Sequence, residues 1–70
     1  MEKVAAHVTG TVAKVEKRQG EKVAPGEVVV VLESMKMEML VEATSGGTIL
    51  EVKCAEGQAV AEGDVLVVIG

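Results

Sequence analysis

The sequence predicts an all-β domain, a sandwich or flattened barrel built from short strands. Valine, whose branched Cβ suits a pleated surface, recurs along the whole chain. Turn signals centred on glycine return at short intervals. The chain also repeats itself, because residues 6–33 align without a gap on residues 43–70 with 11 identities in 28 positions. A length of 70 residues allows one domain, which we expect to span residues 1–70.

The repeat has an offset of 37 residues, and glycines mark it best. Three glycine pairs share this offset: Gly10 with Gly47, Gly20 with Gly57, and Gly26 with Gly63. Glycine marks positions that need a positive φ or a close approach of the backbone, so a shared glycine spacing indicates shared turn geometry. Two copies are too few for a solenoid. We therefore expect two four-stranded halves, related by a twofold axis, to pack face to face around one core.

The first half begins with two short strands. Lys3–Val8 is an apolar strand that a turn at Gly10 ends. Thr11–Glu16 is the second strand. A helix over Val12–Arg18 is the alternative, but Gly20 ends it after too few residues and the β-branched side chains disfavour it.

Two glycine turns divide the rest of the first half. They lie at residues 18–21 and 24–27, and in the second a proline-glycine pair supplies the two backbone conformations that a turn needs. Val23 lies between them as the lone apolar residue of a short third strand. Val28–Leu32 is a continuous apolar run of strand length, which is typical of a strand buried in a sandwich.

The second half repeats this plan after a connector. Glu38–Glu42 resumes strand structure, with Met39 and Val41 on one face. The remaining elements copy the first half in order: turns at 45–47, 56–58 and 62–64, and strands at Thr48–Lys53, Val60 and Val65–Ile69. The connector, residues 33–38, is then a hairpin tip exposed at one end of the sandwich.

The composition excludes several classes of function. A formal net charge of -4 and a pI of about 4.8 argue against nucleic-acid binding, which needs a basic face. No apolar run approaches the roughly 20 residues of a membrane span, and the N-terminus lacks a signal-peptide pattern. The single cysteine, Cys54, forms no internal disulfide, so we expect a cytoplasmic protein. Cys54 and the single histidine, His7, are too few for a zinc site, and His7 is a weak candidate for a general base.

The most unusual stretch of the chain is the connector, Glu33-Ser34-Met35-Lys36-Met37-Glu38. Lys36 is the only lysine at the junction of the two halves, and it has a methionine on each side. An exposed methionine is unfavourable unless a partner packs on it, and its flexible thioether suits an adaptable contact surface. The alternative is that Met35, Met37 and Met39 point inward and cap the core, most readily Met39.

This connector closely resembles the attachment motif of biotinyl domains, the carrier domains of biotin-dependent carboxylases. The similarity extends from about Ala6 to Ile69 and includes the glycine spacing, the twofold repeat and the central lysine. It implies a flattened barrel-sandwich of two four-stranded antiparallel sheets, with the modified lysine on a tight hairpin between the halves. It also implies that biotin protein ligase attaches biotin covalently to Lys36, which Met35 and Met37 flank.

The resemblance assigns lesser roles to the other residues of the connector. Glu33, Ser34 and Glu38 are expected to contribute to recognition by the ligase. The alternative for the two glutamates is that they are ordinary polar ends of a hairpin. Ser34 departs from the family pattern, in which alanine is commoner, and we expect this exchange of one small residue for another to be tolerated.

A carrier of this kind has no catalytic pocket and is not an enzyme by itself. The resemblance implies that it shuttles a carboxyl group between a biotin carboxylase and a carboxyltransferase, and that it is monomeric as an isolated domain. No thumb segment interrupts the first half. The chain is therefore most similar to a stand-alone biotin attachment protein or to the biotinyl end of a longer carboxylase.

Two other functions stay open. A lipoyl carrier of a 2-oxo acid dehydrogenase or of the glycine cleavage system shares the fold, but its lysine usually follows an acidic residue and is not bracketed by methionines. An unmodified lipoyl-like module uses the fold for interaction alone and lacks the modified lysine. Lys36 therefore favours a carrier, and Met35 and Met37 favour biotin. Nothing in the sequence supports an autonomous enzyme.

Overall fold

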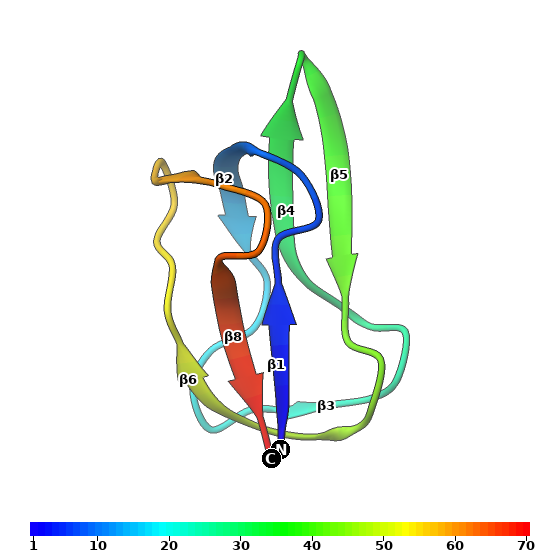
Figure 1. Ribbon diagram of the computed structural model, residues 1–70. Helices are drawn as coiled ribbons and strands as arrows, with labels where there is room; N and C mark the ends of the chain where they lie inside the picture. Colours follow the sequence, from blue (N-terminus) through cyan, green and yellow to red (C-terminus); the bar gives the residue numbers. More distant parts are fainter.

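The computed structural model describes all 70 residues and contains eight strands and no helix. The strands are β1 (Glu2–Ala5), β2 (Gly10–Val15), β3 (Lys22–Val23), β4 (Val28–Ser34), β5 (Met37–Glu42), β6 (Gly47–Val52), β7 (Ala59–Val60) and β8 (Val65–Ile69). They form two four-stranded sheets in the orders β1-β8-β6-β3 and β5-β4-β2-β7, and every pair is antiparallel. The molecule measures 31 × 19 × 18 Å and is drawn out along the β4–β5 hairpin (Figure 1). The predicted sandwich of two four-stranded antiparallel sheets is confirmed.

The twofold repeat is present in both strands and hydrogen bonds. A shift of 37 residues places β2 on β6 and β3 on β7 with identical bounds. The same shift relates β1 to β5 and β4 to β8, so that the first sheet becomes the second. The N–H of Gly20 donates to the Ile49 carbonyl, and the related N–H of Gly57 donates to the Val12 carbonyl, both over 2.8 Å. The glycine spacing therefore did indicate shared turn geometry.

The two halves of the sequence do not pack face to face, and that prediction is wrong. Each sheet contains two strands from each half, because six of the seven connections cross from one sheet to the other. Only β4 and β5 are consecutive strands that lie side by side in one sheet. The halves are interleaved, so neither of them has a sheet of its own.

The core lies between the sheets and is wholly apolar. Its centre comes from β4 and β8, each of which is one of the two inner strands of its sheet, with these buried side chains: Val29, Val30, Leu32, Leu66, Val67 and Ile69. Val12 of β2 and its repeat mate Ile49 of β6 are each 1% exposed. No polar or charged side chain is buried. Aliphatic side chains alone therefore fill the core of a chain that has no aromatic residue.

Four turns of one kind connect the strands, two in each half. In the first, the N–H of Glu21 donates to the Arg18 carbonyl over 3.1 Å, and Gly20 has a φ of +92°. The Glu21 carboxylate in return accepts the N–H of Arg18 over 2.6 Å. The same pair of bonds closes the turns at residues 24–27, 55–58 and 61–64. A positive φ at the third position is that of a type II turn, so the predicted glycine turns are confirmed.

Valine at Gly26 or Gly63 is expected to destabilise the domain. The φ values are +85° and +95°, and a Cβ at either position would meet no atom within 4 Å, so the cost comes from the backbone alone. A left-handed non-glycine residue costs about 1–2 kcal/mol, which lowers the thermal midpoint of a domain this small by roughly 5–15 °C. Thermal unfolding of both variants measures the effect. Glu62→Val is the control, because Glu62 is an exposed position of the turn that contains Gly63. Unchanged midpoints for both glycine variants would contradict the turn geometry.

The bounds of the first strand differ most from the prediction. It ends at Ala5 and not at Val8, because the N–H of Ala6 donates to the Asp64 carbonyl over 2.8 Å where the chain leaves for the other sheet. A register shift beside Ala5 begins this departure. The other strands match the predicted bounds to within two residues. Residues 10–15 form β2, so the alternative helix is excluded.

One carboxylate holds the N-terminal strand. Glu2 of β1 accepts the N–H groups of Thr44 (3.2 Å) and Ser45 (3.1 Å) and both of their hydroxyls, that of Ser45 over 2.6 Å. These bonds, first of all the one from the Ser45 hydroxyl, lower the pKa of Glu2 from its ordinary value of 4.5 to about 2. The Glu2 side chain therefore ties β1 to the connection between β5 and β6.

Glu2→Gln is expected to remove a pH-dependent part of the stability. The folded-state pKa is depressed, so the stabilisation is complete above pH 4.5 and is lost as the pH falls towards about 2. Glu2 is partly exposed, and solvent screening limits the contribution to about 1 kcal/mol. Urea unfolding of both proteins from neutral to acidic pH should show the gap between their midpoints closing across that window. A gap that does not change with pH would contradict this assignment.

Candidate functional site

A two-residue loop joins β4 to β5. Ser34 pairs with Met37 at the end of the ladder, which leaves only Met35 and Lys36 in the loop. Both have a positive φ, 54° and 65°, and they are the only non-glycine residues of the chain that do. A positive φ at both positions is that of a type I′ turn, whose twist matches the twist of the flanking strands.

The sequence of this turn is unusual for its geometry. Type I′ turns favour asparagine and glycine, which tolerate a left-handed backbone. A methionine and a lysine in that region cost on the order of 1–2 kcal/mol each. Strand pairing on both sides holds the turn in spite of this cost. The backbone beneath Lys36 is therefore fixed in one strained conformation, as is common at functional sites.

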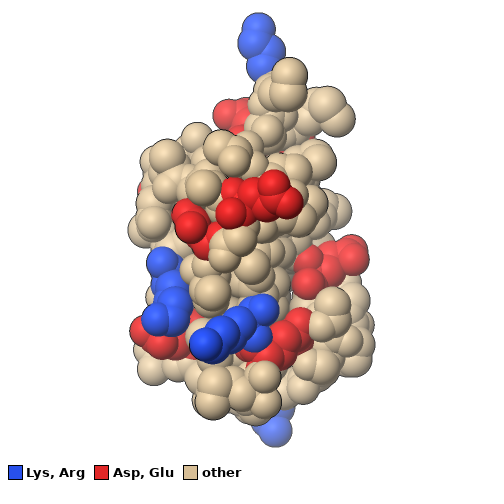
Figure 2. Space-filling model, viewed as in Figure 1, with Lys and Arg blue, Asp and Glu red and all other residues tan.

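Lys36 lies at the extremity of the molecule. The β4–β5 hairpin reaches beyond the sandwich, and the two termini lie together at the opposite end (Figure 1). Figure 2 shows one cationic side chain standing out from this extremity, and Lys36 is the only lysine or arginine between Val28 and Glu42. The side chain is exposed, and it takes part in none of the ion pairs of the structure. The predicted exposed hairpin tip is thus confirmed.

The methionines of the connector divide between the tip and the core. Met35 is 91% exposed and Met37 is 61% exposed. Met39 is partly buried and packs against the core. The inward alternative therefore holds for Met39 and is wrong for Met35 and Met37. Leu40, at 54% exposed, adds a further apolar side chain to the hairpin. An amine with apolar surface beside it suits contact with a partner protein.

Close packing fixes the base of the hairpin. The Ser34 hydroxyl donates to the Thr9 carbonyl over 2.9 Å. A Cβ at Gly10 would lie 2.5 Å from the Glu33 carbonyl oxygen, so β2 approaches β4 as only glycine allows. Glu33 and Glu38 face each other across the strands, and both are exposed. Like charges in direct opposition are unfavourable, so neither glutamate stabilises the hairpin through the other.

The structure brings all six predicted site residues together on this hairpin: Glu33, Ser34, Met35, Lys36, Met37 and Glu38. Two neighbours that support them, Thr9 and Gly10, were not predicted as site residues. The sequence did mark Gly10, since the repeat pairs it with Gly47, and both make a close approach: a Cβ at Gly47 would lie 2.6 Å from the Gly70 carbonyl oxygen. Thr9 acts through its main-chain carbonyl, which any residue could supply, so no signal marked it.

No enclosed site accompanies the lysine. The one pocket of the protein is lined by residues between 51 and 65 and does not include the hairpin. No three metal-binding side chains lie close enough together to hold a metal ion. The protein has no helix that could cross a membrane. A sandwich that presents one amine at the tip of a fixed hairpin, with no cavity beside it, is suited to covalent attachment of a group.

Comparison with known proteins defines the family. Residues 1–69 match the model of the biotin/lipoyl family, described as biotin-requiring enzymes. The chain therefore belongs to the biotin/lipoyl attachment family. No curated protein matches it.

Solved structures of three proteins are similar over nearly the whole chain. The urea carboxylase of Kluyveromyces lactis has a TM-score of 0.93 and 33% identity, over 99% of this chain and 6% of its own. A single-chain, multi-domain long-chain acyl-CoA carboxylase has a TM-score of 0.89 and 33% identity, over 94% of this chain and 7% of its own. The lipoyl domain of the 2-oxoglutarate dehydrogenase complex of Azotobacter vinelandii has a TM-score of 0.77 and 31% identity, over 96% of this chain and 95% of its own. The chain thus corresponds to a small part of each carboxylase and to nearly all of the lipoyl domain.

Proposed function

We propose that this chain carries biotin on Lys36 and moves a carboxyl group between the active sites of a biotin-dependent carboxylase. One observation supports this most directly. Lys36 lies at the tip of the only hairpin of the sandwich, between two methionines that are both exposed. The family and the similarity to two carboxylases agree with it.

Lys36 would hold the cofactor through an amide bond at Nζ. Its exposed side chain has no ion-pair partner, so the neutral amine is free to attack an activated carboxyl group. With biotinyl adenylate as the activated group, a bond would form between Nζ and the carboxyl carbon, the bond from that carbon to the phosphate oxygen would break with AMP leaving, and the amine would lose a proton. Acylation removes the charge of one ammonium group and changes the formal net charge from -4 to -5.

The chain contributes position and not catalysis. Biotin supplies the ureido ring that takes up the carboxyl group. The paired strands and the fixed turn keep Nζ of Lys36 away from the sandwich, so a partner's active site can close around the tip. A tethered group reaches a high effective concentration at each partner site. This chain therefore needs no catalytic side chain of its own, which makes it a carrier and not an enzyme.

A lipoyl carrier is the second candidate, because a lipoyl domain is also similar in structure. Biotin is favoured by the residues beside the lysine. Met35 stands before Lys36 where lipoyl carriers usually have an acidic residue, and the nearest glutamates are Glu33 and Glu38. The TM-scores of 0.93 and 0.89 for the two carboxylases, against 0.77 for the lipoyl domain, support the same choice.

Three partners follow from the proposal. A biotin protein ligase would modify Lys36, a biotin carboxylase would load the carrier, and a carboxyltransferase would unload it. Met35 and Met37 offer the ligase an apolar contact surface, and the charges of Glu33 and Glu38 flank it. We place the protein in the cytoplasm and expect the isolated domain to be monomeric.

Coexpression with each of two ligases in turn tests the proposal. The chain is coexpressed with a biotin protein ligase in one culture and with a lipoate protein ligase in another, each with its cofactor. Intact-mass measurement should show one added biotinyl group in the first sample and little change in the second, with the fragment spectrum placing the group on Lys36. Modification by the lipoate ligase alone, or by neither enzyme, would overturn the proposal.

A further inference from the structure

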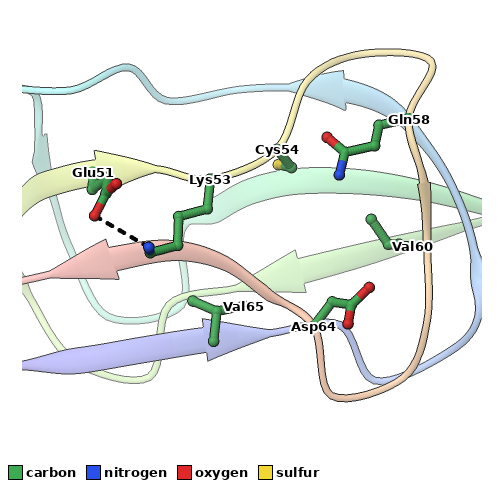
Figure 3. Close-up of a pocket in the computed structure, with 7 residues that line it drawn as sticks. All are labelled: Glu51, Lys53, Cys54, Gln58, Val60, Asp64 and Val65. Atoms are coloured by element: carbon green, nitrogen blue, oxygen red, sulfur yellow. Dashed lines mark ion pairs between the residues drawn. The ribbon is translucent and has the colours of Figure 1, made fainter.

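The two halves differ in shape at one surface, in spite of the twofold repeat. The second half has an open depression with a volume of about 530 Å³, which we call the Cys54 cleft (Figure 3). Half-buried Cys54 lines it together with Val60, Gln58 and Asp64. Burial raises the pKa of the Cys54 thiol, so this side chain is neutral. No such depression is present in the first half.

A lysine occupies the related place in the first half. The offset of 37 residues relates Cys54 to Lys17, Val60 to Val23 and Asp64 to Glu27. The Lys17 side chain is only 19% exposed, and its Nζ lies 3.1 Å from Glu27 Oε2. The same Nζ donates to the Lys22 carbonyl over 3.5 Å. The long side chain of Lys17 therefore lies over the surface that the short side chain of Cys54 leaves open.

The acceptor for an ammonium group is preserved in the second half. Glu27 uses one oxygen to accept the N–H of Ala24 over 2.8 Å and the other to meet Lys17. Asp64 likewise uses Oδ2 to accept the N–H of Ala61 over 2.8 Å, while no hydrogen bond or ion pair engages its Oδ1. The cleft thus keeps the carboxylate of the ion pair, in Asp64, but it lacks the lysine that pairs with the related carboxylate in the first half.

The remaining charges around the cleft cancel one another. Lys53 points along the wall to Glu51, and the two side chains pair over 3.5 Å (Figure 3). The Gln58 amide oxygen accepts a hydrogen bond from the N–H of Ala55 over 3.0 Å. Asp64 is therefore the unpaired charge of this surface, and it favours a cation.

We propose that the Cys54 cleft receives a lysine side chain from a partner protein, in the place that Lys17 takes in the first half. The alkyl chain lies over Val60 and the Cys54 sulfur, and the ammonium group meets Asp64 Oδ1. A partner protein is the occupant because one exposed ion pair contributes at most about 1 kcal/mol. Such a contact holds a lysine only as one of many in a larger interface. The proposal does not depend on modification of Lys36.

A titration tests the cleft directly. The probe is Nα-acetyl-lysine N-methylamide, followed by the amide shifts of the labelled protein. We expect weak, saturable shifts centred on Cys54, Val60 and Asp64, and none with the Nε-acetylated probe. Asp64→Asn should weaken binding about two- to fivefold. This variant keeps the turn, because Gln58 shows that an amide oxygen can cap the related turn. Equal binding to Asp64→Asn would overturn the proposal.

Two variants provide matched controls. Glu27→Gln changes the related carboxylate of the first half, which lies outside the cleft, and should leave probe binding unchanged. Cys54→Lys rebuilds the arrangement of the first half, so it should abolish probe binding and raise the thermal midpoint. Asp64→Asn should cancel that rise. A rise that is independent of Asp64, or no rise at all, would show that the cleft does not accommodate a lysine and would overturn the proposal.

Two further results would overturn the proposal. Butylamine has the alkyl chain and the ammonium group of a lysine side chain, so it should bind about as tightly as the lysine probe, and a complete lack of shifts with butylamine would contradict the proposed contacts. Shifts at Cys54 and Asp64 that appear when the protein alone is concentrated would indicate a second copy of this chain. That outcome would also overturn the proposal.

Discussion

Replacement of Lys36 by arginine is expected to abolish labelling by biotin protein ligase while the fold is retained. Arginine keeps the charge and most of the length, and it meets the same left-handed backbone, φ 65°. Its guanidinium holds its proton far more tightly than an ammonium group does, so arginine offers almost no neutral, nucleophilic nitrogen. An exposed side chain without an ion pair has few stabilising contacts to lose, so the free energy of unfolding should change by no more than about 0.5 kcal/mol.

The measurement combines labelling with a control at another lysine. Avidin binding and intact mass are followed over time for the wild type, Lys36→Arg and Lys53→Arg. Lys53 is exposed and pairs with Glu51 on the second half, so its replacement should leave the labelling rate unchanged. A Lys36→Arg protein that still takes up one biotin at the wild-type rate would refute the assignment of the attachment site.

The sequence predicted the symmetry of the fold better than its connections. Paired glycines such as Gly26 and Gly63 indicate a local requirement of the backbone, a positive φ in a turn. The structure shows this positive φ in both halves. The sheet to which each strand belongs depends on where the chain goes after the turn, which no local signal records. The repeat alone is compatible with one sheet for each half. The crossing connections rule this out, since each carries the chain from one sheet to the other.

The place of the exposed hairpin tip followed from the sequence, but its backbone geometry did not. Lys36 stood out because two methionines flank it at the junction of the repeats. Its left-handed φ runs against the preference of lysine and is imposed by the pairing of Ser34 with Met37, a contact between strands. The Cys54 cleft was also missed. A difference between Lys17 and Cys54 has a meaning only when the surroundings of both residues are known.

A swap of the two turn residues, Met35→Lys with Lys36→Met, is expected to abolish labelling as completely as the loss of the lysine. The exchange keeps the composition, the net charge and one lysine in the same two-residue turn. Both positions have a positive φ, 54° and 65°, so the backbone strain is similar before and after the exchange. The thermal midpoint should therefore stay close to that of the wild type. What changes is the direction in which the amine leaves the backbone.

This direction matters because the turn is fixed. Strand pairing up to Ser34 and Met37 leaves no flexible stretch of main chain that could return a displaced Cα to its former place. A misplacement of about 1 Å at a reacting atom can cost on the order of 100-fold in rate, and adjacent turn positions differ by more than that. Time courses of avidin binding measure the rate, and chemical acylation with a small activated ester shows that the amine is still exposed. Equal ligase rates for the swap and the wild type would mean that the ligase accepts any amine at the tip, and that the fixed geometry of the turn does not select Lys36.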